Sequence, residues 1–267
     1  MVGIRRGLLR SILLVTALNA VASYATAFVG LLLVAEITNV FTYRVGYVAL
    51  LVGTLPPILM VTDLLLYSYV FRAVTLGRPL TLPGAARLLK HLAVASAPVL
   101  LLVAPELVVG VGGVVAEEVF YGAVALVATV WSAILALYAF FVHPVYAPYA
   151  GLTIATCVDW GGRTCVFSSM RRYLRLLPGV IFTSIAVLVL TSLAARVLLS
   201  VAPPLGSTLL PVPDTTPLQP WSYGWFEALR STMPRYYNLI LGPAHYLLYA
   251  YILERVSRRK LQELQRG

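Results

Sequence analysis

The sequence predicts an all-α integral membrane protein, and two observations carry that prediction: the composition and the length of the apolar stretches. Of the 267 residues, 60% are apolar and only 11% are charged, whereas about a quarter of the residues in an ordinary soluble domain are charged. A helix needs about 20 apolar residues to cross a bilayer. Six stretches meet that length, at residues 11–35, 45–70, 92–115, 119–142, 178–201 and 236–254. We expect one transmembrane domain over 1–267, with the first helix retained rather than cleaved as a signal peptide.

The distribution of basic residues predicts the orientation of these helices. Sixteen of the twenty Lys and Arg residues precede the first helix, join helices two and three, join helices four and five, or follow helix six. Positive charge favours the cytoplasmic side during insertion, so we expect a multi-pass protein of the cell membrane with both termini in the cytoplasm. An anionic inner leaflet is the partner that these charges suit. The net charge of +10 therefore needs no nucleic acid to explain it.

Two cytoplasmic segments, or elbows, have the pattern of short amphipathic helices. Residues 86–92 and 166–177 each place apolar side chains at helical spacing opposite basic ones. The basic residues assigned to the lipid surface are Arg87, Lys90, Arg171, Arg172, Arg175, and, in a helical tail over 255–267, Arg258, Arg259 and Lys260. The elbows could lie under the inner leaflet or pack against the bundle. A protein partner could also bind the elbows or the tail.

Glu117 and Glu118 resemble the Glu-Glu motif of the CAAX-type intramembrane proteases. In this sequence Tyr121 and Gly122 stand where that motif continues to an Arg. His143 lies 25 residues after Glu118, which is about 37 Å along a helix, so the two cannot share a metal or a water. We therefore expect a solvated acidic turn between helices three and four, and no catalytic or metal site there.

Residues 144–154, Pro-Val-Tyr-Ala-Pro-Tyr-Ala-Gly-Leu-Thr-Ile, are followed by Gly161-Gly162-Arg163 and by a basic amphipathic segment. This order resembles the uncharacterised prokaryotic six-helix membrane proteins related to the membrane domain of glycerophosphodiester phosphodiesterases. The resemblance implies a turn, a strand-like run, a glycine turn and a basic helix that enters helix five. It implies no phosphodiesterase residues, since in that family the chemistry belongs to a separate soluble domain. The insertion around Cys157 departs from the family pattern.

Cys157 and Cys165 lie on either side of a Gly-Gly hairpin signal, and residues 153–158 and 164–167 have the composition of short strands. Reduced structural thiols are the first expectation for a cytoplasmic location, and a disulfide is the second, as in hyperthermophiles. The excess of Arg over Lys is loosely typical of an archaeal thermophile. A metal comes third, because two cysteines are too few ligands.

Ionisable groups inside a bilayer are costly and are default candidates for function. Asp63 is the strongest candidate, in the second helix just after Pro56 and Pro57, which are expected to break that helix. Asp63 could belong to an ion or proton pathway, or it could lie near headgroup water, bonded to a neighbouring helix. Glu106 and Arg196 are expected near the same outer depth and could form an ion pair.

Two classes of function fit these features. The first is a non-catalytic subunit or scaffold of a membrane complex, which agrees with the basic elbows and with the lack of a paired acid and base. The second is a transporter or channel for ions, small solutes or imported DNA, using Asp63 and the broken helix. The outer Pro-rich loop over 202–233 carries aromatic residues that suit headgroup anchoring. No cofactor is expected, and an enzyme ranks behind both classes.

Overall fold

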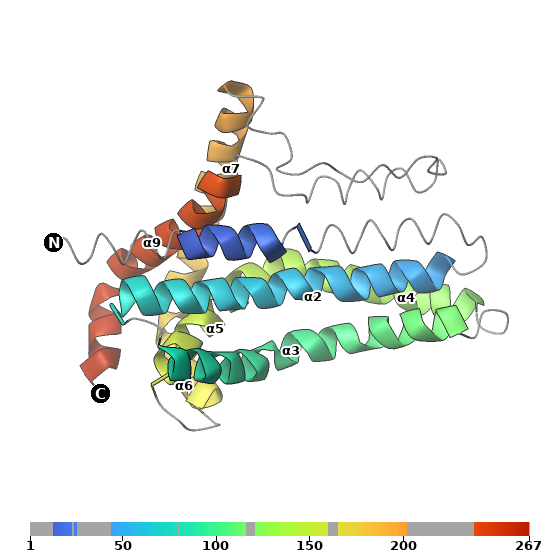
Figure 1. Ribbon diagram of the computed structural model, residues 1–267, viewed down its shortest axis with the longest axis horizontal. Coiled ribbons are helices and arrows are strands. Elements are labelled where there is room, and N and C mark those ends of the chain that lie inside the picture. Colours follow the sequence, from blue (N-terminus) through green and yellow to red (C-terminus); the bar gives the residue numbers. More distant parts are fainter. Residues whose placement is uncertain are drawn as a thin grey trace.

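The computed structural model of the protein describes residues 13–22, 24–25, 44–78, 81–115, 121–159, 165–201 and 238–266, and every element in those ranges is helical (Figure 1). Four helical segments there are long and apolar enough to cross a membrane: Pro56–Thr75, Pro83–Val111, Val130–Cys157 and Cys165–Val201. The expectation of an all-helical protein is therefore confirmed for the described residues, where four helical segments, against the six spans expected, have the length and composition to cross a membrane. Glu117, Glu118 and the outer loop 202–233 lie outside the described residues, as do 13 of the 25 residues of the predicted span 11–35. The predicted span 236–254 coincides with the first part of α9 (Asn238–Arg266).

Helices α2 (Arg44–Val70) and α3 (Leu82–Val115) lie side by side and are joined through the π-helical turn η1 (Phe71–Thr75) (Figure 1). In the connection Gly77 has φ 62°, a left-handed conformation that glycine adopts without steric cost. Thr81 then caps α3, because its hydroxyl accepts the backbone N–H of Gly84 at 3.3 Å. The first predicted elbow is thus the beginning of α3. Leu88 and Leu92 are buried there, and Arg87 and Lys90 are exposed.

The prediction that Pro56 and Pro57 break the second helix is wrong. Both prolines lie inside α2, which is helical from Arg44 to Val70. They remove two N–H donors, but their fixed φ is compatible with a helix. Packing along α3 holds α2 in one piece despite the missing hydrogen bonds.

The fourth predicted helix does not end at residue 142. Helix α4 (Tyr121–Leu137) continues through the π-helical turn η2 (Tyr138–Val142) into α5 (His143–Cys157). The turn expected from the resemblance at residues 144–154 is therefore helical, and so is the strand expected at 153–158. The stretch 165–167 begins another helix, so the hairpin interpretation is wrong wherever the structure describes it.

Tertiary packing explains why α5 is a helix despite its β-branched residues. One side of α5 is lined by small residues, and a Cβ added at Gly151 would lie 2.6 Å from the Cβ of Tyr67 in α2. Ala147, Ala150 and Ala155 are also buried in the core. This close approach of α5 to α2 buries most of α5 and outweighs local strand propensity.

Helix α6 (Cys165–Tyr173) leads through the 3₁₀ turn η3 (Leu174–Leu176) into α7 (Leu177–Val201). The second elbow is amphipathic as predicted: Val166, Tyr173 and Leu176 are buried in the core, whereas the side with the arginines is exposed. Helix α7 leaves the bundle and contacts mainly α9 (Figure 1). Many apolar side chains are exposed along the length of α7, among them Phe182, Ile185, Leu193 and Val197.

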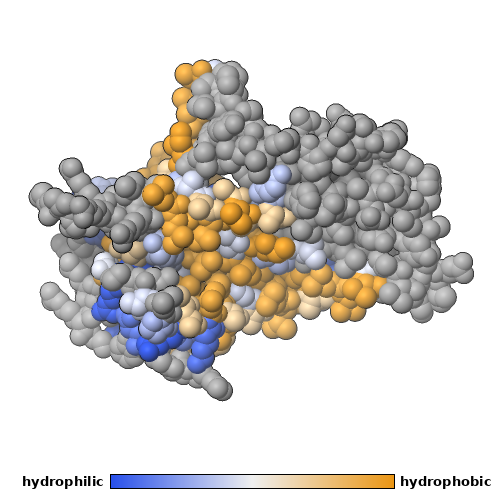
Figure 2. All heavy atoms as spheres, in the orientation of Figure 1, coloured by the Kyte–Doolittle hydropathy of each residue, from blue (hydrophilic) through white to orange (hydrophobic). Residues whose placement is uncertain are grey.

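The surface agrees with a membrane-embedded molecule. Figure 2 shows apolar residues along the bundle and on α7, whereas hydrophilic residues gather at the end where α6 and the start of α3 lie. Leu101, Val108 and Phe140 are among the exposed apolar residues of the bundle. Such a broad apolar surface is unusual for a soluble monomer and is expected of helices that face lipid.

Candidate functional site

Asp63 lies where three helical elements meet. The Tyr246 hydroxyl of α9 donates to Asp63 Oδ1 at 2.6 Å, and His143 Nε2, at the start of α5, lies 3.3 Å from Asp63 Oδ2. The His143 side chain is 8% exposed, whereas that of Asp63 is 39% exposed. The carboxylate is therefore held by two polar partners on one side and remains open on the other. We call Asp63, His143 and Tyr246 the Asp63 cluster.

An aromatic cluster of Tyr67, Phe71, Tyr246 and Tyr249 supports this arrangement. The ring of Tyr67 packs edge-on against Tyr246, with 4.9 Å between centroids, and against Tyr249, with 5.1 Å. Edge-to-face contacts of this kind are the favoured geometry for aromatic pairs. They hold the Tyr246 ring so that its hydroxyl reaches Asp63. Tyr67 also bonds through its hydroxyl to His245 Nε2 at 2.9 Å, which adds a second histidine beside the cluster.

His143 follows the π-helical turn η2 directly, and π turns inside helices often occur at functional sites. The Nδ1 atom of His143 is buried and has no hydrogen-bond partner among the described residues. With a proton on Nε2, His143 donates to Asp63 Oδ2, and the buried Nδ1 then carries no proton.

A hydrogen bond from α7 compensates for a proline close to the cluster. Pro148 has no N–H, so the carbonyl of Pro144 loses its helical donor. The Ser184 hydroxyl donates to that carbonyl at 2.8 Å and lies 3.1 Å from the Tyr249 hydroxyl, which donates to the carbonyl of Val180. Helices α5, α7 and α9 are thereby joined behind His143.

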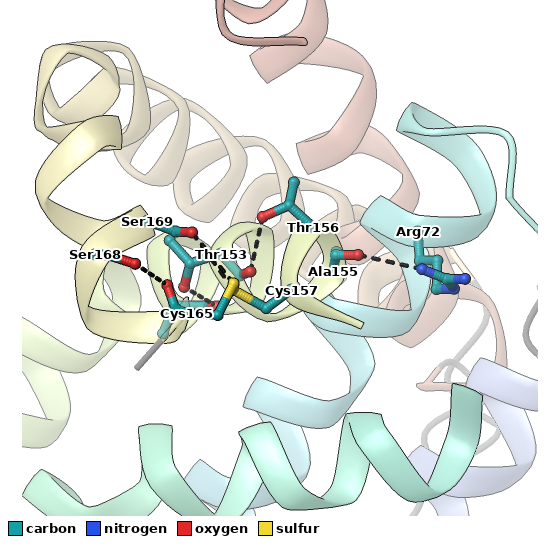
Figure 3. The surroundings of a disulfide bond; sticks show 9 residues. Arg72, Thr153, Ala155, Thr156, Cys157, Cys165, Ser168 and Ser169 are labelled. Atoms are coloured by element: carbon teal, nitrogen blue, oxygen red, sulfur yellow. Dashed lines mark hydrogen bonds between the residues drawn. A yellow bond between two sulfur atoms is a disulfide. The ribbon is translucent and has the colours of Figure 1, made fainter. Parts of the chain in front are cut away.

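A second polar group, which we call the arginine clamp, consists of Arg72, Arg78 and Asp159. Arg72 is buried, and its Nη2 lies 2.8 Å from Asp159 Oδ1, while Arg78 donates to the other carboxylate oxygen. Arg72 also donates to the carbonyl of Ala155 at 3.3 Å (Figure 3). The hydrogen bond from Arg72 outweighs the burial of Asp159, and with that from Arg78 it lowers the pKa of the Asp159 carboxyl below its ordinary value. The clamp fixes the end of α5 to η1.

Cys157 and Cys165 form a disulfide beside the clamp, with 5.8 Å between their Cα atoms (Figure 3). The bond joins the end of α5 to the start of α6. The Ser169 hydroxyl lies 3.4 Å from the sulfur of Cys157 and 3.6 Å from that of Cys165. Reduced thiols were the first expectation for this pair, and the structure instead has the second, a bonded pair. Among the described residues no group of three His, Cys, Asp or Glu residues could hold a metal.

The predicted ion pair between Glu106 and Arg196 is not formed. Glu106 is completely buried and accepts a hydrogen bond from Ser132 of α4, whereas Arg196 is exposed on α7. The prediction rested on the similar depth of Glu106 and Arg196 along their helices. An ion pair also requires that the two side chains lie on helix faces that are turned toward each other. The basic residues assigned to lipid in the elbows are exposed as expected: Arg87, Lys90, Arg171, Arg172 and Arg175. The side chains of Arg258, Arg259 and Lys260 lie outside the described residues.

Sequence reasoning identified Asp63 but missed its partners. Those partners are His143 and Tyr246. A usable signal was present, because Asp63 is one of the few ionisable residues inside the predicted apolar spans and His143 directly follows another of these spans. The sequence did not show that Asp63 and His143, which are 80 residues apart, come into contact in the folded protein. No family model, no curated protein and no solved structure matches this chain.

Proposed function

We propose that the protein is a membrane transport protein that moves protons or small cations, with the Asp63 cluster as its site. The observation that carries this proposal is the half-open Asp63 carboxylate, bonded to His143 and Tyr246 between apolar helices. A carboxylate turned toward hydrocarbon is unfavourable. The open side of Asp63 therefore needs water or a cation.

The chemistry of the cluster suits a proton or a small cation. Asp63 and His143 can exchange a proton across their 3.3 Å contact, and Tyr246 keeps the carboxylate in place by donating to its other oxygen. A carboxylate oxygen is also a ligand that hard cations accept. Pro56 and Pro57 lie two turns before Asp63 on the same helix and leave backbone carbonyls without helical donors, which offers more oxygen ligands along this path.

The test is proton and cation flux into liposomes that hold the purified protein. Asp63→Asn keeps the shape of the side chain and removes its charge, and we expect at least a tenfold loss of flux. Tyr246→Phe, which removes only one donor to the carboxylate, is expected to cause a smaller loss. Thr62→Val is the matched control, because the Thr62 hydroxyl bonds to the carbonyl of Ile58 within the same helix and to no other described residue. Native protein with no more flux than empty liposomes, or an unchanged Asp63→Asn variant, would reject the transport function.

A non-catalytic subunit of a membrane complex is the second candidate, and the exposed apolar sides of α7 favour it. A photoreactive side chain at Phe182, which is 59% exposed, would then form adducts with another protein in native membranes. The neighbouring Thr183 is fully buried and serves as the control position. Adducts with lipid alone at position 182 would indicate that this part of α7 faces the bilayer.

A further inference from the structure

Glu106 is a buried acid that the Asp63 cluster does not use. It lies on α3 inside the apolar segment Pro83–Val111 and is 0% exposed. Two side chains of α4 reach the same turn of α3. The Ser132 hydroxyl donates to Glu106 Oε1 at 2.9 Å, and Trp131 Nε1 donates to the carbonyl of Leu102 at 2.6 Å. These contacts hold the Glu106 side chain between the two helices.

In the part of the chain that the structure describes, Glu106 has no counter-charge. Its Oε2 atom has no hydrogen-bond partner among the described residues, and no basic side chain of that part of the chain forms an ion pair with it. A carboxylate there would keep its full charge in an apolar span with a single neutral donor. Burying an unpaired charge in this way is so unfavourable that the group takes up a proton instead.

A protonated Glu106 fits the same contacts better. Oε1, as the carbonyl oxygen of the acid, accepts the Ser132 hydroxyl, and Oε2 carries the proton. The Oε2 atom, which receives no hydrogen bond from the described residues, then bears no charge.

We propose that Glu106 is a proton-binding site, held as a neutral carboxylic acid between α3 and α4 at neutral pH. This site is independent of the transport function proposed for Asp63. It lies about 25 Å farther along the α2–α3 hairpin, since Asp63 precedes the end of α2 by seven residues and Glu106 follows the start of α3 by 24. A proton bound there neutralises the one acidic group that is fully buried in the described part of α3.

Infrared spectroscopy of the purified protein tests the proposal directly. At about pH 8, roughly four units above the ordinary pKa of Glu, exposed carboxyl groups are ionised and contribute no carboxylic C=O band. We expect the native protein to keep such a band and Glu106→Gln to lose it. Ser132→Ala should keep the band but shift it to higher wavenumber, because the C=O group then loses its hydrogen bond. Asp159→Asn is the control and should leave the band in place, since the arginine clamp keeps Asp159 ionised.

A carbodiimide reaction gives a second measurement. Dicyclohexylcarbodiimide reacts with the acid form: the acid proton moves to a carbodiimide nitrogen, the carboxyl oxygen bonds to the central carbon, and the adduct rearranges to a stable N-acylurea. Mass spectrometry should find this adduct on the peptide that contains Glu106 at about pH 8. Absence of the infrared band in native protein, or its persistence in Glu106→Gln, would overturn the proposal. Loss of both band and adduct on adding Na⁺ would also overturn it, because Glu106 would then bind a cation.

Discussion

Asp159 is the residue whose charge the fold depends on most clearly. Its carboxylate is shared by Arg72, which is buried, and Arg78, which is exposed. If Asp159 becomes neutral, Arg72 keeps a buried charge without a counter-charge and retains only its hydrogen bond to the carbonyl of Ala155, whereas the exposed Arg78 can be solvated by water at little cost. The two arginines therefore contribute unequally although both touch the same carboxylate.

We predict that Asp159→Asn lowers the free energy of unfolding at pH 7 by about 1–3 kcal/mol, because a buried charge loses its partner. Arg78→Gln should cost less, about 0–1 kcal/mol, since exposed pairs contribute little. Thermal unfolding in detergent, followed by tryptophan fluorescence, measures both. Equal destabilisation by the two variants would contradict the unequal roles of the arginines.

The ionised Asp159 carboxylate also predicts that the stability of the protein depends on pH. The pKa of the Asp159 carboxyl is lowered in the folded protein, so its stabilisation is fully present above the unfolded value of about 3.9. It is lost as the pH falls through the lower folded value. Native protein should therefore lose stability on acidification below about pH 4, and the Asp159→Asn variant should lose less over the same range. A variant with the same acid-induced loss as native protein would argue against the clamp.

At the scale of single elements, the close crossing of α2 and α5 depends on Gly151, because glycine has no side chain. A Cβ at Gly151 would lie 2.6 Å from the Cβ of Tyr67 and 3.1 Å from the backbone nitrogen of Ser68. Backbone atoms and a Cβ cannot turn away, so the helices must separate. At Gly179 in α7 the added Cβ would instead meet the hydroxyl of Ser257, which can rotate.

We predict that Gly151→Ala destabilises the protein by about 1–3 kcal/mol, as overpacking does in other cores. Gly179→Ala should be close to neutral, since better helix propensity offsets a small adjustment. Both variants remove a glycine from a helix, so the comparison separates the clash from propensity. Apparent melting temperatures in one detergent provide the measurement. A Gly151→Ala variant as stable as Gly179→Ala would show that the two helices do not cross so closely.

The disulfide joins two elements. It links the end of α5 to the start of α6 through two cysteines that are eight residues apart in the sequence. Replacing Cys157 and Cys165 together by Ala should cost about 2–3 kcal/mol in the chain-entropy description of cross-links. Adding a reductant to native protein should lower its melting temperature to about that of the double variant. The reductant should leave the melting temperature of the double variant unchanged. Alkylation of either cysteine in protein that is denatured without reductant would show that the bond is absent.

The elements also show how far the sequence could be interpreted. Apolar length predicted the helical regions 45–70, 92–115 and 178–201 well, because a membrane helix is recognised from composition alone. It ended the fourth helix at 142, and residues 144–158 were expected to form a turn, from the family resemblance, and a short strand, from their composition, whereas α5 covers 143–157. There the outcome depended on Gly151 and its alanine neighbours meeting α2, and on Ser184 donating to the carbonyl of Pro144. Both are contacts between distant segments, which local pattern cannot supply, and the pairing of Asp63 with His143 is of the same kind.

At the scale of the whole molecule, the Asp63 cluster and the arginine clamp lie at two different depths. The Asp63 cluster lies inside the helices, and the arginine clamp lies nine residues farther along α2 and η1, about 13 Å away along the axis. The clamp, the disulfide and the exposed arginines of α6 all belong to one end of the bundle. A rigid polar end of this kind can anchor the helices while the carboxylate inside remains open.

The orientation of α7 provides the sharpest test of this arrangement in a membrane. Helix α7 has 25 residues, about 37 Å, which is enough to cross the hydrocarbon core. Arg171 precedes it in α6 and Ser200 lies near its end, and both are exposed.

If the positive-inside bias orients the chain, a cysteine at position 171 should react with a membrane-impermeant maleimide in inside-out vesicles only. A cysteine at position 200 should react in right-side-out vesicles only. The native cysteines are bonded to each other and should not react, so single substitutions suffice. Labelling of both positions from one side would mean that α7 does not cross the membrane, and its exposed apolar sides would then have to be covered by protein.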